Sequence, residues 1–89
     1  MGNRFDSQGM LQQALSLHRS GRLNAAEPLY RAILRERPSD PDAHNLLGVL
    51  CHQTGRHKEA VSYLKKALRK RPKDVDILRN YGSALGASG

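Results

Sequence analysis

Apolar residues recur at spacings of three and four along most of this chain, and polar or charged residues fill the positions between them. After Asp40-Pro41, such spacing places one set of apolar side chains on a single helix face: Ala43, Leu46, Leu47, Leu50 and Cys51. Gly55 then offers the left-handed turn residue that commonly ends a helix. A second amphipathic stretch follows, with Ala60, Val61, Leu64, Ala67 and Leu68 on its apolar face. Pro72 closes it, because helices rarely continue past the residue before a proline.

This two-helix plan repeats at a spacing of 34 residues. Most of the recurring residues are those that begin, turn or tightly pack helices: Asp6, Asp40 and Asp74; Gly21, Gly55 and Gly89; Pro38 and Pro72; Ala26 and Ala60; Gly48 and Gly82. His18 and His52 also match. A fixed period of this length indicates stacked repeats. The sequence therefore predicts an all-α solenoid of antiparallel helix pairs with about five helices.

The period also predicts the organisation of the chain. We expect an N-terminal tail over residues 1–5 and a repeat domain over residues 6–89. Within that domain, repeat 1 covers about 7–40, repeat 2 about 41–74, and the first helix of a third repeat about 75–89. The recurring aspartates are expected to cap the first helices, because a side-chain oxygen can accept from the free N–H groups there.

The outer repeats carry their own local expectations. In repeat 1, Asn24 with Glu27 resembles a capping box for the second helix. Pro28 predicts that this helix starts late or bends. In the third repeat, the apolar residues expected to face inward are Leu78, Tyr81 and Leu85. Gly48 and Gly82 are expected to let helices approach closely, because a larger side chain there would push the pair apart.

The second unit, "NLLGVL…TGRHKEAVSYLKKAL…P", resembles the tetratricopeptide repeat family. The positions that match its signature are Leu47, Gly48, Gly55, Ala60, Ala67 and Pro72. His44 stands where an aromatic residue is usual, and Cys51 stands where a large residue is usual. The first unit is looser: Ala14, Gly21, Ala26 and Pro38 fit, whereas Ile33 replaces a small residue. The resemblance covers about residues 6–89 and implies a right-handed superhelix.

The resemblance also implies a function, namely protein–protein interaction through a concave groove lined by the first helix of each repeat. Such a groove holds an extended peptide or a partner's helix. The residues that would line it here are Gln8, Leu11, Leu15, His18, Arg19, Asp42, Asn45, Val49, His52, Gln53, Asp76, Arg79 and Ser83. This expectation makes the chain a binding module and not an enzyme.

Two subgroups of the family suggest narrower functions. One clamps the C-terminal carboxylate of chaperones, but of the matching positions Leu11, Leu15, Leu46, Arg79 and Ser83 only Arg79 fits, so we reject it. Another precedes the catalytic part of O-linked sugar transferases and related bacterial enzymes and carries an asparagine ladder. Asn80 fits that ladder, whereas Gln12 and Leu46 do not. A substrate-recruiting segment of a larger bacterial transferase is therefore the alternative function.

Charge supports a third and weaker interpretation. The formal net charge is +7, and "LKKALRKRPK", residues 64–73, is its densest basic run. Cations near a helix C-terminus interact favourably with the helix dipole, which explains part of this run. Nucleic-acid binding through the basic face is a weaker alternative, because single-strand binders usually add aromatic stacking platforms and this chain has few aromatic residues.

Catalysis and metal binding have little support in the residues. Cys51 lies on the apolar stripe of its helix, where a free cysteine behaves as a small hydrophobic residue. His18 and His52 are equivalent and are expected to lie near each other, but a metal site needs three or four ligands and no third is evident. His44 and His57 are interpreted as ordinary packing or surface residues. We predict no cofactor, no metal and no catalytic residues.

Location and assembly are predicted only in outline. One cysteine, no apolar run of membrane-spanning length and no signal-peptide pattern favour a cytoplasmic protein without membrane contact. The apolar last helix lacks the polar outer face of a terminal cap. We therefore expect a piece of a longer array, with possible self-association through Leu78, Tyr81 and Leu85 if they are uncovered.

Overall fold

The fold consists of five consecutive α-helices, seen in a computed structural model that describes residues 5–89. No strand occurs in that range. Apart from Phe5, the predicted tail lies outside the described residues. The helices are α1 (Ser7–Arg19), α2 (Leu23–Glu36), α3 (Pro41–Gln53), α4 (His57–Lys70) and α5 (Val75–Ser88). The all-α prediction and its five helices are confirmed.

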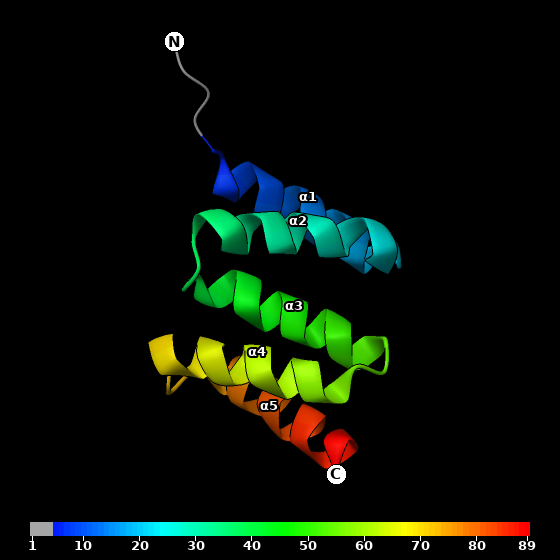
Figure 1. Cartoon of the computed structure of the whole chain (residues 1–89), viewed down its shortest axis with the longest axis vertical. Helices are drawn as coiled ribbons and strands as arrows, with labels where there is room; N and C mark the ends of the chain where they lie inside the picture. Colours follow the sequence, from blue (N-terminus) through cyan, green and yellow to red (C-terminus); the bar gives the residue numbers. More distant parts are fainter. Residues whose placement is uncertain (1–4) are drawn as a thin grey trace.

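The helices stack along one long axis as antiparallel neighbours (Figure 1). α1 packs on α2 and α3 packs on α4, while α2 with α3 and α4 with α5 join the successive repeats. In this view α2 lies in front of α1, and α4 lies in front of α5. The stack measures 49 × 27 × 18 Å. Each repeat therefore contacts mainly its neighbours, as expected for a solenoid.

Aspartate caps begin all three first helices. The backbone N–H of Gly9 donates to Asp6 over 3.0 Å, that of Ala43 to Asp40 over 3.0 Å, and that of Ile77 to Asp74 over 3.1 Å. These bonds satisfy one of the free N–H groups of each first turn. The predicted role of the recurring aspartates is confirmed.

The second helices begin without side-chain caps, unlike the prediction for repeat 1. α2 and α4 follow Arg22 and Arg56, and neither residue forms a side-chain cap. Each helix is preceded by a glycine with positive φ, +84° at Gly21 and +82° at Gly55, a conformation that favours glycine. The tight turn places Asn24 inside α2, so the predicted capping box is wrong.

Pro28 does not delay the start of α2, which begins at Leu23 and runs through the proline to Glu36. The amide N–H that proline lacks would have reached the carbonyl group of Asn24, four residues earlier. Asn24 is exposed, so water can hydrogen-bond that carbonyl group instead. The predicted late start is therefore wrong, whereas its alternative, a bend at Pro28, stays a prediction.

Small residues set the closest helix contacts in the middle of the stack. A Cβ added at Gly48 would lie 2.7 Å from Cγ of Leu64 and 3.3 Å from the carbonyl oxygen of Ala60. Leu64 and Ala60 are both fully buried. Glycine at this position therefore lets α3 and α4 touch. Gly82 is different, because an added Cβ there meets no atom within 4 Å, so its predicted close contact is absent.

The inward face of α5 also differs from the prediction. Ile77 and Ala84 are buried, whereas Leu78 is 45% exposed and Leu85 is 43% exposed. Tyr81 is half-buried and packs against the core. α5 packs mainly on α4, and no helix in the described residues covers its other side. The prediction that Leu78 and Leu85 face inward is wrong for this reason.

Gly48→Ala and Gly82→Ala form a matched test of the helix contact. Alanine favours a helix interior over glycine by about 0.5–1 kcal/mol. At Gly82 nothing opposes that gain, so the free energy of unfolding should rise by about that amount. At Gly48 the new methyl group collides with Leu64, and overpacking costs about 1–3 kcal/mol. Gly48→Ala should therefore lower the stability in urea unfolding.

The comparison between the two variants removes the contribution of helix propensity, which they share. If Gly48→Ala proved as stable as Gly82→Ala, the α3–α4 contact at Gly48 would not limit side-chain size. Circular dichroism before unfolding checks that both variants keep the helical content of the wild type.

Candidate functional site

The residues predicted to line the groove lie on α1, α3 and α5, and they differ in exposure. Some are half-buried: Leu11, Leu15, His18, Asp42, Asn45, Val49 and His52. The others are exposed: Gln8, Arg19, Gln53, Asp76, Arg79 and Ser83. Half-buried apolar side chains flanked by exposed polar ones form a mixed surface, which suits peptide contact better than a fully polar one.

Two hydrogen bonds join neighbouring first helices. Nε2 of His18 on α1 donates to Oε1 of Gln53 on α3 over 2.6 Å. Nδ2 of Asn80 on α5 donates to Oδ1 of Asn45 on α3 over 3.0 Å. Asn80 fits the asparagine ladder of one subgroup of the family, and it pairs here with Asn45, the neighbour of its repeat equivalent Leu46. These bonds fix the spacing of the first helices.

His18 is held from both sides of its ring. Its Nδ1 lies 2.8 Å from the hydroxyl group of Tyr30, and the two rings meet edge to face. Tyr30 is fully buried, and burial raises the pKa of its hydroxyl to about 12. With Gln53 on the other nitrogen, both ring nitrogens of His18 have partners. His18 therefore acts as a fixed polar connection between α1, α2 and α3.

Among the described residues, His52 forms no hydrogen bond with His18. Its Nδ1 lies 3.0 Å from Nδ1 of His57, at the start of α4, with the ring centroids 4.9 Å apart.

Cys51 is buried, and burial raises the pKa of its thiol, so it behaves as the predicted core residue. Residues 5–89 contain no group of three or more His, Cys, Asp or Glu side chains placed to hold a metal.

Two of the predicted groove acids have cationic partners. Asp42 accepts from Arg71 over 2.8 Å, which ties α3 to the turn after α4. Asp76 accepts from Arg79 over 3.4 Å within α5. Both pairs are exposed, so each contributes little to stability. Their effect is to reduce the net charge of the surface formed by the first helices.

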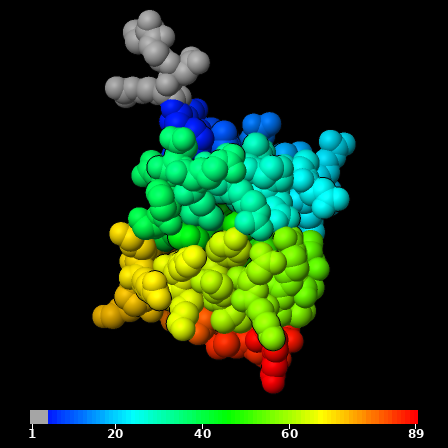
Figure 2. Space-filling model, viewed as in Figure 1, coloured from blue at the N-terminus to red at the C-terminus, as the bar shows by residue number. Residues whose placement is uncertain are grey.

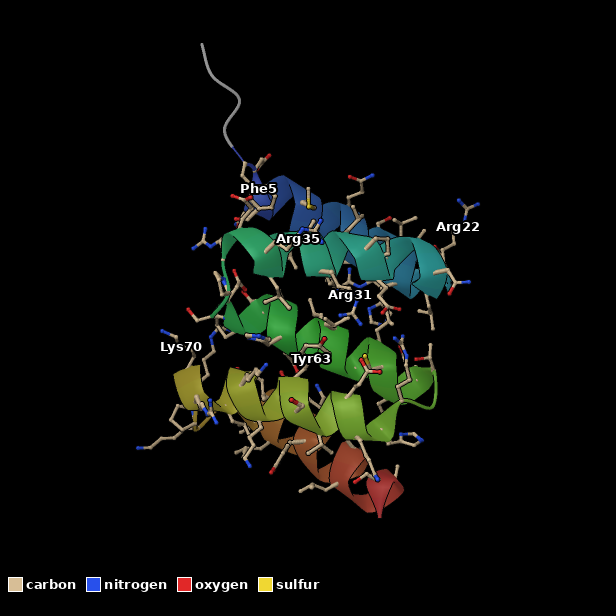
Figure 3. The ribbon with its side chains drawn as sticks, viewed as in Figure 1. Phe5, Arg22, Arg31, Arg35, Tyr63 and Lys70 are labelled. Atoms are coloured by element: carbon tan, nitrogen blue, oxygen red, sulfur yellow. The ribbon has the colours of Figure 1, made fainter. Side chains whose placement is uncertain are left out.

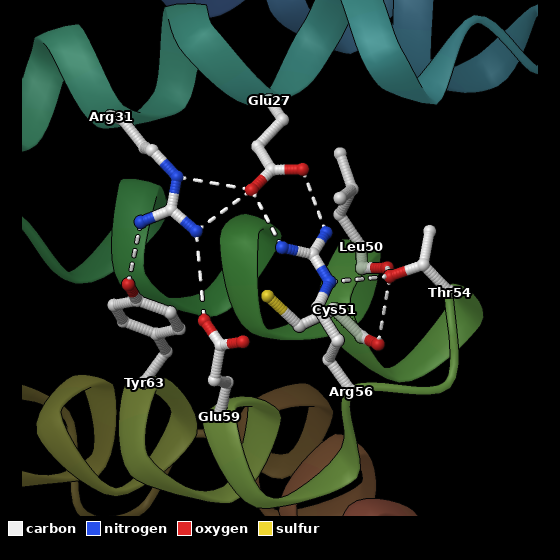
Figure 4. Close-up of polar contacts among 8 residues, drawn as sticks. All are labelled: Glu27, Arg31, Leu50, Cys51, Thr54, Arg56, Glu59 and Tyr63. Carbon is white, nitrogen blue, oxygen red and sulfur yellow. Dashed lines mark hydrogen bonds and ion pairs between the residues drawn. The ribbon is translucent and has the colours of Figure 1, made fainter.

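The strongest polar cluster lies between the second helices (Figure 4). Glu27 on α2 accepts two hydrogen bonds from Arg56, at 2.7 and 2.8 Å, and two from Arg31, at 2.7 and 3.0 Å. Arg31 also donates to the hydroxyl group of Tyr63 on α4 over 2.8 Å and lies 3.7 Å from Glu59. One carboxylate thus binds two guanidinium groups and connects repeat 1 to repeat 2.

This cluster lowers the pKa of Glu27. The hydrogen bonds from Arg56 and Arg31 hold that pKa at about 2, against an ordinary value of 4.5, although burial acts in the opposite direction. The same contacts raise the pKa of both arginines. Sequence analysis assigned Glu27 to a capping box. The four-residue spacing from Glu27 to Arg31 could have predicted an ion pair along α2. It gives no indication of the contacts with Arg56 and Tyr63.

The comparison with known protein families agrees with this architecture. The model of the tetratricopeptide repeat matches residues 11–75. The chain therefore belongs to the tetratricopeptide repeat family, as predicted. These repeats are a non-catalytic module that generally mediates protein–protein interaction. A search of curated proteins finds no match. Among the described residues, every helix is too short or too polar to cross a membrane.

Glu27→Gln tests the cluster between the repeats. Removing a charged acceptor of several hydrogen bonds should cost about 1–3 kcal/mol in the free energy of unfolding at pH 7. Because folding lowers the pKa of Glu27, its stabilisation is complete above pH 4.5 and disappears as pH falls through about 2. The stability difference between the wild type and Glu27→Gln should shrink over that range, measured by urea unfolding at several pH values.

Glu36→Gln is the matched control. Glu36 is an exposed carboxylate at the end of the same helix and forms no ion pair within residues 5–89. Its replacement should change the stability by less than about 0.5 kcal/mol. Equal effects of the two substitutions would show that Glu27 acts through net charge and not through its arginine partners.

Proposed function

We propose that this chain is a peptide-binding module whose contact surface is formed by the first helices α1, α3 and α5. The observation that carries the proposal is the pair of hydrogen bonds between successive first helices, His18 to Gln53 and Asn80 to Asn45. They hold three helices side by side at a fixed spacing. A preorganised surface binds with less loss of conformational freedom.

The side chains on this surface suggest what it would bind. Leu11, Leu15 and Val49 offer half-buried apolar contacts, and Gln8 and Arg19 are exposed polar groups beside them. Asp42 and Asp76 have cationic partners, so strong single-sign attraction is not expected here. This combination favours an extended peptide or an amphipathic helix with apolar anchors and polar flanks.

The other interpretations stay predictions. The chain as a substrate-recruiting part of a larger bacterial transferase would use the same surface. Self-association has support from α5, where the apolar side chains of Leu78 and Leu85 are both exposed. Nucleic-acid binding through the basic face has support from net charge alone.

Val49→Arg tests the surface of the first helices. Val49 is half-buried at the middle of α3, where a long side chain can extend to solvent, so the protein should stay folded. A peptide selected from a random library against the wild type should bind Val49→Arg at least tenfold more weakly, because the long charged side chain would replace the apolar surface of Val49 and occupy the space of the peptide. Isothermal titration calorimetry measures both affinities.

Ser62→Arg provides the same added charge on the exposed side of α4 and should leave that affinity unchanged within about twofold. NMR spectra of the wild type with the selected peptide give a second measurement, in which amide shifts should concentrate on α1, α3 and α5. Shifts confined to α2 and α4, or equal losses in both variants, would contradict the proposed surface.

A further inference from the structure

A second surface lies on the side formed by α2 and α4, away from the predicted groove. Two adjoining hollows of roughly 370 and 200 Å³ open there, between the end of α2, the start of α3 and the middle of α4. Both are lined by Pro38, His44 and Lys66. The space-filling view shows this side of the molecule, with α2 and α4 in front (Figure 2). We call the two together the basic hollow.

Positive charge dominates the basic hollow. Its cationic lining residues come from α2 and α4: Arg31, Arg35, Lys66, Arg69 and Lys70. No carboxylate lines either part of it. Arg31 is already engaged with Glu27, whereas the other four form no ion pair within the described residues. In Figure 3, Arg31 lies on the side of α2 that faces Tyr63 of α4, and Lys70 lies at the end of α4. Four uncompensated cations around one cavity favour an anionic ligand.

The floor of the basic hollow is less polar than its rim. Leu34 and Pro38 contribute aliphatic surface, and the rings of His44 and Tyr63 stack at 25° with centroids 6.2 Å apart. His44 is only 5% exposed, and burial together with the Lys66 ammonium lowers the pKa of its imidazole. Burial thus disfavours the charged form of the ring, whose face stacks on Tyr63 as part of the wall of the hollow.

We propose that the basic hollow binds an acidic peptide segment, in which carboxylates flank one apolar side chain. The apolar side chain would sit on Leu34 and Pro38, and the carboxylates would pair with Arg35, Lys66 and Arg69. Guanidinium groups bind carboxylates through two parallel hydrogen bonds, which gives orientation as well as attraction. A cavity of this size holds a short segment.

Nucleic acid is less well matched to this surface. Single-strand binding commonly uses exposed aromatic rings as platforms for bases. Here Tyr63 is already occupied by its own chain: His44 stacks on it, Arg31 donates to its hydroxyl group, and the ammonium group of Lys66 lies 5.8 Å from its ring centroid. Apart from Tyr63 and the buried ring of His44, no aromatic residue lines the basic hollow.

The nearest acidic groups are engaged elsewhere. Asp40 caps α3 through Ala43 and lies 3.6 Å from Arg37. Glu59 lies 3.7 Å from Arg31, at the edge of the Glu27 cluster. Neither lines the basic hollow, so an incoming carboxylate does not have to displace an internal one.

The test uses a fluorescein-labelled peptide with four glutamates on each side of one leucine, followed by fluorescence anisotropy. The wild type should bind it, and added salt should weaken the binding. Lys66→Ala combined with Arg69→Ala should weaken the binding at least tenfold, since both cations leave the basic hollow. Lys58→Ala combined with Lys73→Ala is the control, which removes the same charge from exposed positions elsewhere and should change the affinity less than twofold.

Each other result overturns the proposal. No binding by the wild type, or equal weakening in the two double variants, would mean that the basic hollow is no specific site. Tighter binding of a twelve-nucleotide oligothymidine, lost in Lys66→Ala with Arg69→Ala, would reassign this surface to nucleic acid. Val49→Arg should leave the acidic peptide's affinity unchanged, so failure of the groove proposal and failure of this one are distinguishable. Circular dichroism verifies that both double variants are folded.

Discussion

The close contact of α3 with α4 at Gly48 is the constraint on which the rest of the stack depends. There the backbone of α3 approaches the buried side chain of Leu64, with no room for even one methyl group. A helix pair of this length cannot bury its apolar faces alone, so it is stable only when it is nested and covered by neighbours. α3 packs on both α2 and α4, and α4 packs in turn on α5. Displacing α4 would therefore disturb both repeats.

Two kinds of polar contact then connect the repeats on opposite sides of the molecule. Between first helices the contacts are short, largely uncharged hydrogen bonds, such as that between Asn80 and Asn45. Between second helices the contact is ionic, with Glu27 bound by Arg31 and Arg56. The first kind leaves a surface of mixed polarity for the proposed groove. The second engages the Glu27 carboxylate with Arg31 and Arg56, so Glu27 is not available to the other cations on the α2–α4 side.

Features that depend on neighbouring residues in the chain were predictable from sequence. Helix caps and glycine turns depend only on residues close in the sequence, and their recurrence every 34 residues makes them easy to recognise. The caps are formed by Asp6, Asp40 and Asp74, and the turns by Gly21 and Gly55. The capping box was wrong because two local signals competed, and the glycine turn started α2 before Asn24. For the candidate site, sequence could assign residues to first helices, but whether they form one binding groove stays a prediction.

What the residues alone established is the family, the helix pairs and most of the core, because apolar periodicity and capping act over a few residues. What required the folded chain are contacts between residues far apart in the sequence and the exposure that packing leaves: the partners of His18, the bonds from Arg56 to Glu27, and the exposed Leu78 and Leu85. Equivalent residues do not have equivalent surroundings. Gly48 is covered by α4 while Gly82 meets nothing, since packing depends on which helix lies opposite and not on position within the repeat.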